Sequence, residues 1–245
     1  MVLNLVSLLM SLNLKTGENN AHQRYTFALL GIVFAWSLLF AGVLFIRFTD
    51  QQAEAILPPL ERGVMASSLL LLSWAFLTAD HTRWRHSSNT IVLIMLLLIA
   101  IAYAITGILW IEIAGDVDFN LIPFGESWLF TLFSLPIFGI LLTVLFFGDV
   151  IDAPLKLVYF LMVALGGGAT IYQMMMNGLI GNDIGLFRLT YTLAQVMVPL
   201  IVYRAVIRQY EFELEDRSIR GSTPIPPPQV VMAPPPPEPV RVSTS

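Results

Sequence analysis

Residues 91–113 read IVLIMLLLIAIAYAITGILWIEI, and Glu112 is the one charged residue in this run. At a rise of about 1.5 Å per residue, an α-helix of this length crosses the roughly 30 Å hydrocarbon core of a membrane. Five further runs share this character: residues 27–46, about 60–77, 128–147, about 157–176 and about 189–207. The sequence therefore predicts an all-α fold, a polytopic helical membrane bundle with six transmembrane helices.

The composition agrees with a membrane domain and excludes several kinds of chemistry. Charged residues make up 12% of the 245-residue chain, whereas a soluble domain carries about 25%. There is no cysteine, which excludes disulfides, thiolate metal sites and a cysteine nucleophile. No basic stripe of the kind that binds nucleic acid is present. The lipid bilayer is the partner that this composition predicts.

The N-terminal segment, residues 1–24, contains an apolar run that is too short to span a membrane. Residues 2–14 read VLNLVSLLMSLNL, with Asn4, Ser7 and Ser11 at i, i+3 and i+7. This spacing places a polar stripe along one face of a helix. We expect a short amphipathic N-terminal helix that lies in the membrane surface. The alternative is a short additional span.

Basic residues predict the orientation, because Lys and Arg favour the cytoplasmic side. With the N-terminus inside, ten of the 13 Lys and Arg residues are cytoplasmic. Arg47, Arg62 and Arg188 are the three on the outer side. The loop at residues 114–127 is acidic and has no basic residue, so it is expected outside. Both termini are therefore predicted to be cytoplasmic.

The transmembrane domain is predicted to cover residues 25–207. Residues 208–220 are polar and favour helix, so a cytoplasmic helical extension of the last span is expected there. Residues 221–245 are rich in proline, which favours an extended, disordered tail.

Ionisable residues offer little for catalysis. His22, His81 and His86 fall in predicted cytoplasmic segments outside the spans, and the middle of the bundle contains no carboxylate. Glu61 and Arg62 open the second predicted span, after Pro58 and Pro59, where interfacial anchoring is the simpler interpretation and an outer-face site the alternative. No phosphate-binding loop, nucleophile elbow or zinc motif is present. We therefore expect no enzyme, no cofactor and no metal.

The last predicted span is the most polar of the six. Thr192 and Gln195 lie on one face with Pro199, which predicts a kink. Together with Tyr203 they form a candidate polar pocket for a small ligand. The alternative is that these side chains only form hydrogen bonds between helices.

Small residues in the fifth span form a candidate helix-packing surface. Gly166, Gly167 and Gly168 are consecutive, and glycines allow helices to approach closely in lipid. The partner is either a neighbouring span or a second copy of the chain in a homodimer.

Three stretches resemble a known family. They are ILPPLERGVMASSLLLLSWAFL (Ile56–Leu77), FNLIPFGESW (Phe119–Trp128) and GNDIGLFRLTYTLAQVMVPLIVYRAV (Gly181–Val206). Together they resemble the membrane-embedded amino-terminal sensor region of bacterial multidomain histidine kinases. The resemblance implies signal sensing or anchoring in the bacterial inner membrane. The kinase domains that follow in that family are missing here, so we expect a detached sensor region or a membrane domain that works without a kinase.

Three hypotheses on function follow. The first is a non-enzymatic membrane sensor or anchor module of a signalling system, with a ligand received at the outer loops or the last span. The second is a structural subunit or assembly factor of a larger complex, with other membrane subunits as partners. The third is a small-molecule transporter, which the lack of buried charge within the spans disfavours.

Overall fold

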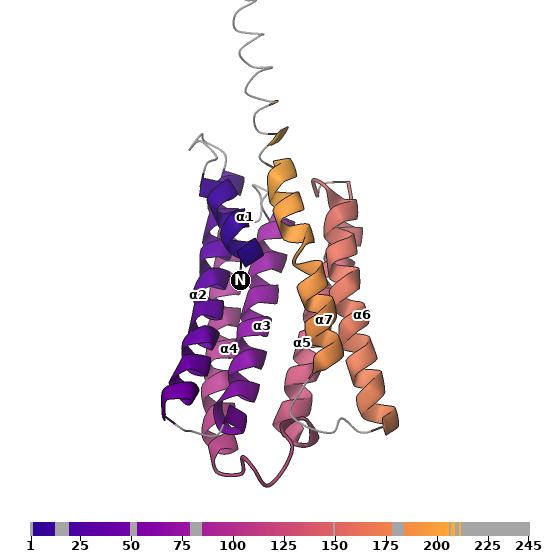
Figure 1. Cartoon of the computed structure of the whole chain (residues 1–245). Coiled ribbons are helices and arrows are strands. Elements are labelled where there is room, and N and C mark those ends of the chain that lie inside the picture. Colours follow the sequence, from indigo (N-terminus) through magenta and orange to yellow (C-terminus); the bar gives the residue numbers. More distant parts are fainter. Residues whose placement is uncertain are drawn as a thin grey trace, which may run out of the picture. The chain divides into compact units, whose positions relative to one another are not determined.

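The computed structural model describes residues 2–12, 20–49, 53–78, 85–148, 150–177, 184–205, 207–208 and 211. Six helices are long and apolar enough to cross a membrane, which confirms the predicted helical multi-pass bundle (Figure 1). They are α2 (Asn20–Thr49), α3 (Ala53–Thr78), α4 (Arg85–Ile111), α5 (Pro123–Leu145), α6 (Ala153–Asn177) and α7 (Gly185–Ala194), whose span continues to Ala205. A short helix α1 (Val2–Leu12) precedes them, and a 3-10 turn η1 (Phe119–Leu121) precedes α5.

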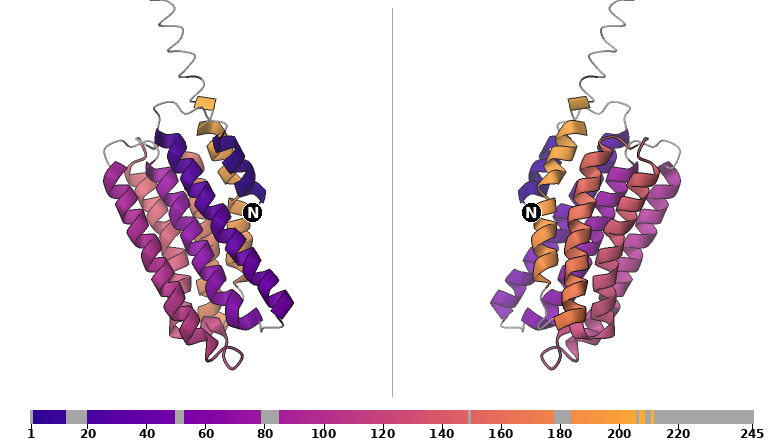
Figure 2. Two further views of the ribbon diagram at one scale, coloured as in Figure 1. Left: turned by 90° about the vertical axis from the view of Figure 1, so that its left-hand side faces the viewer. Right: turned by 90° about the vertical axis from the view of Figure 1, so that its right-hand side faces the viewer.

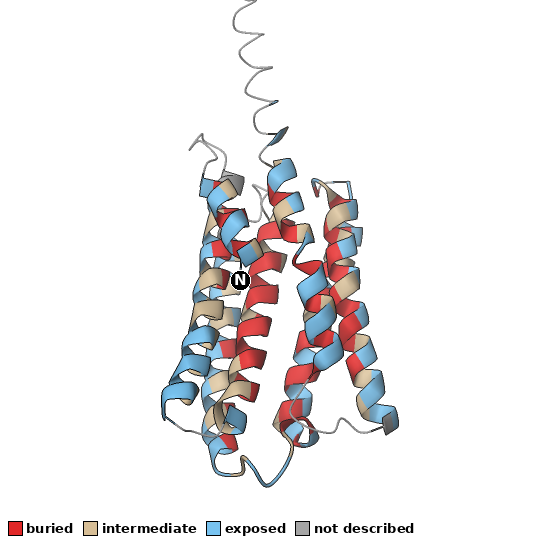
Figure 3. Ribbon diagram, viewed as in Figure 1, coloured by how far each residue is buried: buried red, intermediate tan, exposed pale blue. Residues whose placement is uncertain are grey.

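Helix α3 is the centre of the bundle and packs against α2, α4 and α5. It is buried over most of its length (Figure 3), whereas α2 and α4 expose long apolar faces. Helix α5 packs against α6, and α6 against α7. Helix α7 therefore joins the bundle mainly through α6, and its links to α3 lie in a few side chains described below.

The second span begins earlier than the sequence predicts. Pro58 and Pro59 lie inside α3 and not at its start. Proline cannot donate a backbone hydrogen bond, so Pro58 releases the carbonyl of Glu54 one turn earlier. The Trp110 indole donates to this carbonyl from α4 at 2.7 Å. This side-chain donor satisfies the released acceptor, which is how α3 tolerates proline near its first turns.

Two basic side chains cap the other end of α3. The buried Lys156 Nζ donates to the carbonyl of Phe76 at 2.8 Å, and Arg24 Nη1 donates to the carbonyl of Thr78. The last carbonyls of a helix have no partner within the helix and carry partial negative charge. Lys156 from α6 and Arg24 from α2 therefore fix this end of α3 against its neighbours.

The N-terminal helix α1 has the predicted polar stripe, but the stripe faces the protein. Asn4, Ser7 and Ser11 are buried, and the Ser11 and Thr26 hydroxyls are 2.6 Å apart. The exposed face is apolar. Figures 1 and 2 show α1 running beside α2 from one end of the bundle toward its middle. The predicted short amphipathic helix is therefore confirmed, with its polar stripe toward the protein and its apolar face outward.

The last span is interrupted at Gln195–Val196, where the chain forms a turn between two helical segments. The amide of Val198 donates to the carbonyl of Gln195 at 3.2 Å in place of a regular helical bond. Pro199 has no N–H to donate to that carbonyl. The predicted kink in this span therefore has its local cause in Pro199.

Residues 1–207 form one compact unit and residues 208–245 a second. Of the predicted helical extension at residues 208–220, the structure describes Arg208 and Glu211. The predicted proline-rich tail and His81 lie outside the described residues.

Candidate functional site

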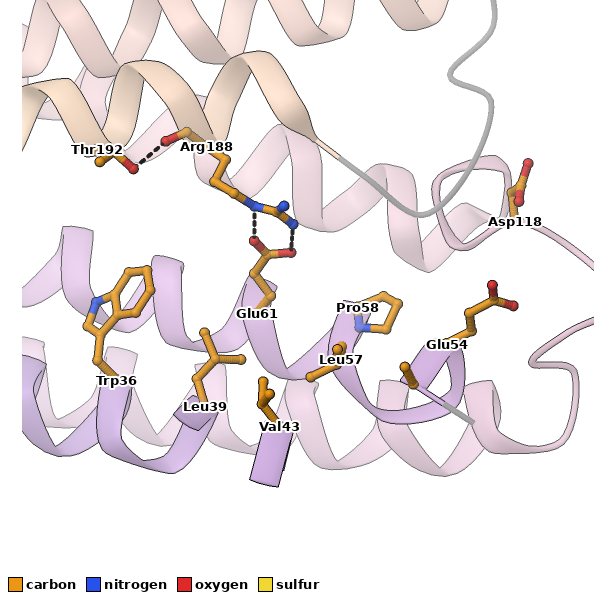
Figure 4. A pocket seen from close by; sticks show the side chains of 11 residues that line it. Trp36, Leu39, Val43, Glu54, Leu57, Pro58, Glu61, Asp118, Arg188 and Thr192 are labelled. Atoms are coloured by element: carbon orange, nitrogen blue, oxygen red, sulfur yellow. Dashed lines mark hydrogen bonds and ion pairs between the residues drawn. The ribbon is translucent and has the colours of Figure 1, made fainter. Parts of the chain in front are cut away.

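A cavity of about 690 Å³ opens between α2, α3, α7 and the loop before η1 (Figure 4). The lining comprises Trp36, Leu39, Val43, Ala53, Glu54, Leu57, Pro58, Glu61, Asp118, Arg188 and Thr192. Two further cavities, of about 270 and 280 Å³, have no charged side chain in their linings. The volume of the first falls within the range of about 300–1,000 Å³ that is typical of small-molecule sites. It is therefore the candidate site among the described residues.

An ion pair bridges this cavity from α3 to α7. The carboxylate of Glu61 accepts hydrogen bonds from Arg188 Nε at 2.7 Å and from Arg188 Nη2 at 2.9 Å. This is the two-point geometry in which a guanidinium binds a carboxylate most strongly. Glu61 is 9% exposed, whereas the Arg188 side chain is 47% exposed. Figure 4 shows the two side chains meeting between α3 and α7. The pair is buried on the α3 side and accessible on the α7 side.

A second guanidinium lies behind Glu61. Arg62 Nη1 donates to the same carboxylate at 3.0 Å, and Arg62 is 0% exposed. Its Nη2 donates to Asn120 Oδ1 at 3.1 Å, and its guanidinium carbon lies 5.8 Å from the centre of the Phe119 ring. A buried charge needs such compensation, because removing it from water is costly. We refer to Glu61, Arg62, Asn120 and Arg188 as the charged network.

Close packing holds the η1 segment against α4 and α5. A Cβ atom at Gly125 would lie 1.8 Å from the Phe119 carbonyl oxygen, so this position requires glycine. The Phe119 ring is fully buried and meets the Trp110 ring edge to face at 5.1 Å. These contacts seat Asn120 opposite Arg62 and thereby complete the charged network.

Beside the cavity, several polar atoms around the last span are buried without a hydrogen bond of regular geometry. Trp36 and Tyr191 stack with ring centres 6.2 Å apart. Trp36 Nε1, Ser68 Oγ and Tyr191 Oη lie together here, and Gln195 Oε1 is buried without a hydrogen-bond partner in the described part of the chain. Each such atom costs free energy that a satisfied interface does not. The polar side chains on this surface therefore have fewer hydrogen bonds than Arg188 has at the start of α7.

The structure separates the three residues of the predicted polar pocket. Thr192 lines the cavity and donates to the Arg188 carbonyl at 2.7 Å. Gln195 is buried and lies 3.4 Å from the Tyr159 hydroxyl on α6. Tyr203 is exposed and is not among the lining residues. Of the predicted set, Thr192 alone belongs to the cavity.

The glycines of α6 pack within the chain. A Cβ at Gly166 would lie 1.6 Å from the Thr190 hydroxyl on α7, and one at Gly167 would lie 3.0 Å from the Phe133 ring on α5. Gly168 faces the same ring at 3.5 Å. These glycines pack against neighbouring spans, and Gly166 and Gly167 are buried, so they are not available to a second copy.

The interpretation of Glu61 and Arg62 as interfacial anchors is wrong, because both side chains are buried and bonded. Helix α3 is enclosed by α2, α4 and α5, and the Glu61 and Arg62 side chains are long enough to bond to each other although they are neighbours on the helix. The sequence contained one indication of this cluster. Glu61, Arg62 and Arg188 all fall near the outer ends of their predicted spans, at the same predicted membrane depth.

Among the residues that the structure describes, no three His, Asp or Glu side chains lie close enough together to hold a metal ion. No family model matches the chain, and no curated protein and no solved structure does either. The function is therefore inferred from the geometry of the cavity and of α7.

Proposed function

We propose that this chain is a non-enzymatic membrane sensor or anchor module of a signalling system. A small ligand enters the cavity and changes the contact between Glu61 and Arg188. Helix α7 then shifts relative to α3 and passes the change along its length. A ligand acts in this way when it binds two arrangements of the bundle with different affinity.

The ion pair across the cavity is the observation that carries this proposal. Glu61 and Arg188 bridge two helices at a place where a molecule of several hundred Å³ has room. Any ligand that competes for either charge alters the connection between α3 and α7. Because the pair is partly shielded from water, its interaction is stronger than that of an exposed pair.

Helix α7 has the features of an output element. It ends at Ala194, and the last span continues after a turn at Gln195–Val196, where Gln195 Oε1 is buried without a hydrogen-bond partner in the described part of the chain. Beyond the turn, Arg204 Nη1 lies 3.5 Å from Asp152 Oδ1 in the turn before α6. Ion pairs thus hold the last span on both sides of this turn, and in a sensor we expect loss of one to change the contacts at the other.

The resemblance to histidine kinase sensor regions supports the same proposal. Each of its three stretches supplies part of the charged network: Ile56–Leu77 supplies Glu61 and Arg62, Phe119–Trp128 supplies Asn120, and Gly181–Val206 supplies Arg188. Stretches that are far apart in the sequence thus share one cluster of contacts.

The proposed orientation has the cavity on the outer side of a bacterial inner membrane. The cytoplasmic end is then the one at which Lys156 and Arg24 cap α3 and at which the last span ends. A signal from outside would leave the membrane through the last span, toward residues 208–220.

The exposed apolar faces of α2 and α4 favour the second candidate function, a structural subunit or assembly factor. In a sensor these faces contact lipid. In a larger complex they would contact other membrane subunits. The two functions differ in whether α7 must respond at one end to a change at the other.

A spin-label experiment tests that difference. The chain contains no cysteine, so Leu93→Cys on α4 and Tyr203→Cys near the end of the last span place two labels at exposed positions on an otherwise unlabelled background. Arg188→Gln removes the bond to Glu61 at the far end of α7. For a sensor, we expect the distance distribution between the labels to shift or broaden in this variant, measured by double electron–electron resonance in nanodiscs.

Arg47→Gln is the matched control, because it removes an exposed arginine at the end of α2 and should leave the distribution unchanged. If Arg188→Gln also leaves it unchanged, the two ends of α7 are not coupled, and the sensor function is contradicted.

A further inference from the structure

The lining of the cavity defines a chemical class of ligand, an inference that rests on the proposed function. We propose that the cavity binds a small organic cation, a protonated amine attached to an apolar body.

The formal charge of the lining is negative. Glu54, Glu61 and Asp118 contribute three carboxylates, and Arg188 contributes one guanidinium. The buried Arg62, bonded to Glu61 at 3.0 Å, adds a second positive charge behind the wall. The formal charges of these five groups sum to −1. A monovalent cation therefore neutralises the site, whereas a monovalent anion makes its net charge −2. In a cavity bordered by apolar walls this difference is larger than in open water.

The acids are positioned so that an ammonium group can enter without displacing Arg188. Figure 4 shows Glu54 and Asp118 toward one end of the cavity, Arg188 bonded to Glu61 in the middle, and Trp36 toward the other end. An ammonium near Glu54 and Asp118 adds a positive charge to the cavity that holds the Glu61–Arg188 pair. We expect this charge to repel Arg188 and to weaken its bond to Glu61, which is the change that the sensor requires.

The remaining wall suits an apolar body. Six of the eleven lining residues are apolar: Trp36, Leu39, Val43, Ala53, Leu57 and Pro58. Burial of hydrocarbon against this wall adds affinity roughly in proportion to the area removed from water.

Three probes of similar size and different charge test the proposal: 2-phenylethylamine, 3-phenylpropionate and 2-phenylethanol. Each is titrated into the full chain in nanodiscs and measured by calorimetry, with empty nanodiscs subtracted. We expect the amine to bind at least about tenfold more tightly than the carboxylate or the alcohol. The combined variant Glu54→Gln and Asp118→Asn should weaken amine binding by about tenfold and leave alcohol binding unchanged.

Asp116→Asn is the matched control, because Asp116 is an exposed carboxylate in the same loop and does not line the cavity. Glu54→Gln alone keeps the test valid if Asp118→Asn disturbs the loop, since Glu54 is exposed. Equal or tighter binding of the carboxylate, no binding of the amine, or unchanged amine affinity in the variants would each overturn the proposal. The spin-label experiment uses no ligand, so the sensor function can stand if this ligand class is wrong.

Discussion

Replacement of Glu61 with alanine is expected to lower the free energy of unfolding by about 3–5 kcal/mol, the range for breaking a buried ion pair. The reason is that Glu61 is the shared partner of Arg62 and Arg188. Without it, two guanidiniums face one another, and Arg62 is fully buried. Unfolding of the purified protein in mixed micelles of increasing denaturing detergent measures the change.

Glu112→Ala is the control for this substitution. Glu112 is an exposed carboxylate just after α4, and surface changes of this kind usually lie within about 0.5 kcal/mol. Arg188→Ala should cost less than Glu61→Ala, because Glu61 keeps its bond to Arg62. In the double variant the two effects should not add, since both remove the same contact. Equal stability of Glu61→Ala and Glu112→Ala would show that the network is not a structural core of the site.

Replacement of Gly166 with alanine is expected to destabilise the bundle by about 1–3 kcal/mol, the usual effect of overpacking. The added Cβ would lie 1.6 Å from the Thr190 hydroxyl and 2.7 Å from the Thr190 Cβ. Helices α6 and α7 must therefore separate, although α6 is the main packing partner of α7. The same unfolding assay reports the loss, and Thr190→Ala in addition should restore part of it.

Gly107→Ala is the opposite case in the same fold. Gly107 lies inside α4 with nothing within 4 Å of the added Cβ. Because alanine favours helix over glycine by about 0.5–1 kcal/mol, this variant should be neutral or slightly more stable. A similar response of both glycines would mean that the contact between Gly166 and Thr190 is not close.

The bundle was predictable because each span is encoded by a continuous apolar run. The start of the second span was not predictable, because Pro58 and Pro59 are typical of a helix start. The hydrogen bond from Trp110 that compensates for Pro58 comes from a different helix, so no local pattern shows it. For α1 the polar stripe was visible in the sequence. The side that it faces depends on Thr26 and the rest of α2, which no local pattern reveals.

The candidate site was predictable in part. The polarity of the last span drew attention to Thr192, which lines the cavity, and an outer-face site at Glu61 was the alternative to interfacial anchoring. The pairing of Glu61 with Arg188 joins residues 127 positions apart. Periodicity describes one helix at a time, so it cannot show which helices exchange charged contacts. A shared membrane depth was the only information about this pairing in the sequence.

Purification of the protein from its native membrane in mild detergent, followed by mass spectrometry of what remains bound, tests the central claim most directly. A sensor or anchor module is expected alone, as a homodimer, or with signalling proteins such as a kinase. Recovery in fixed stoichiometry with other integral membrane subunits, which cover α2 and α4, would contradict the sensor function and identify the chain as a component of that complex.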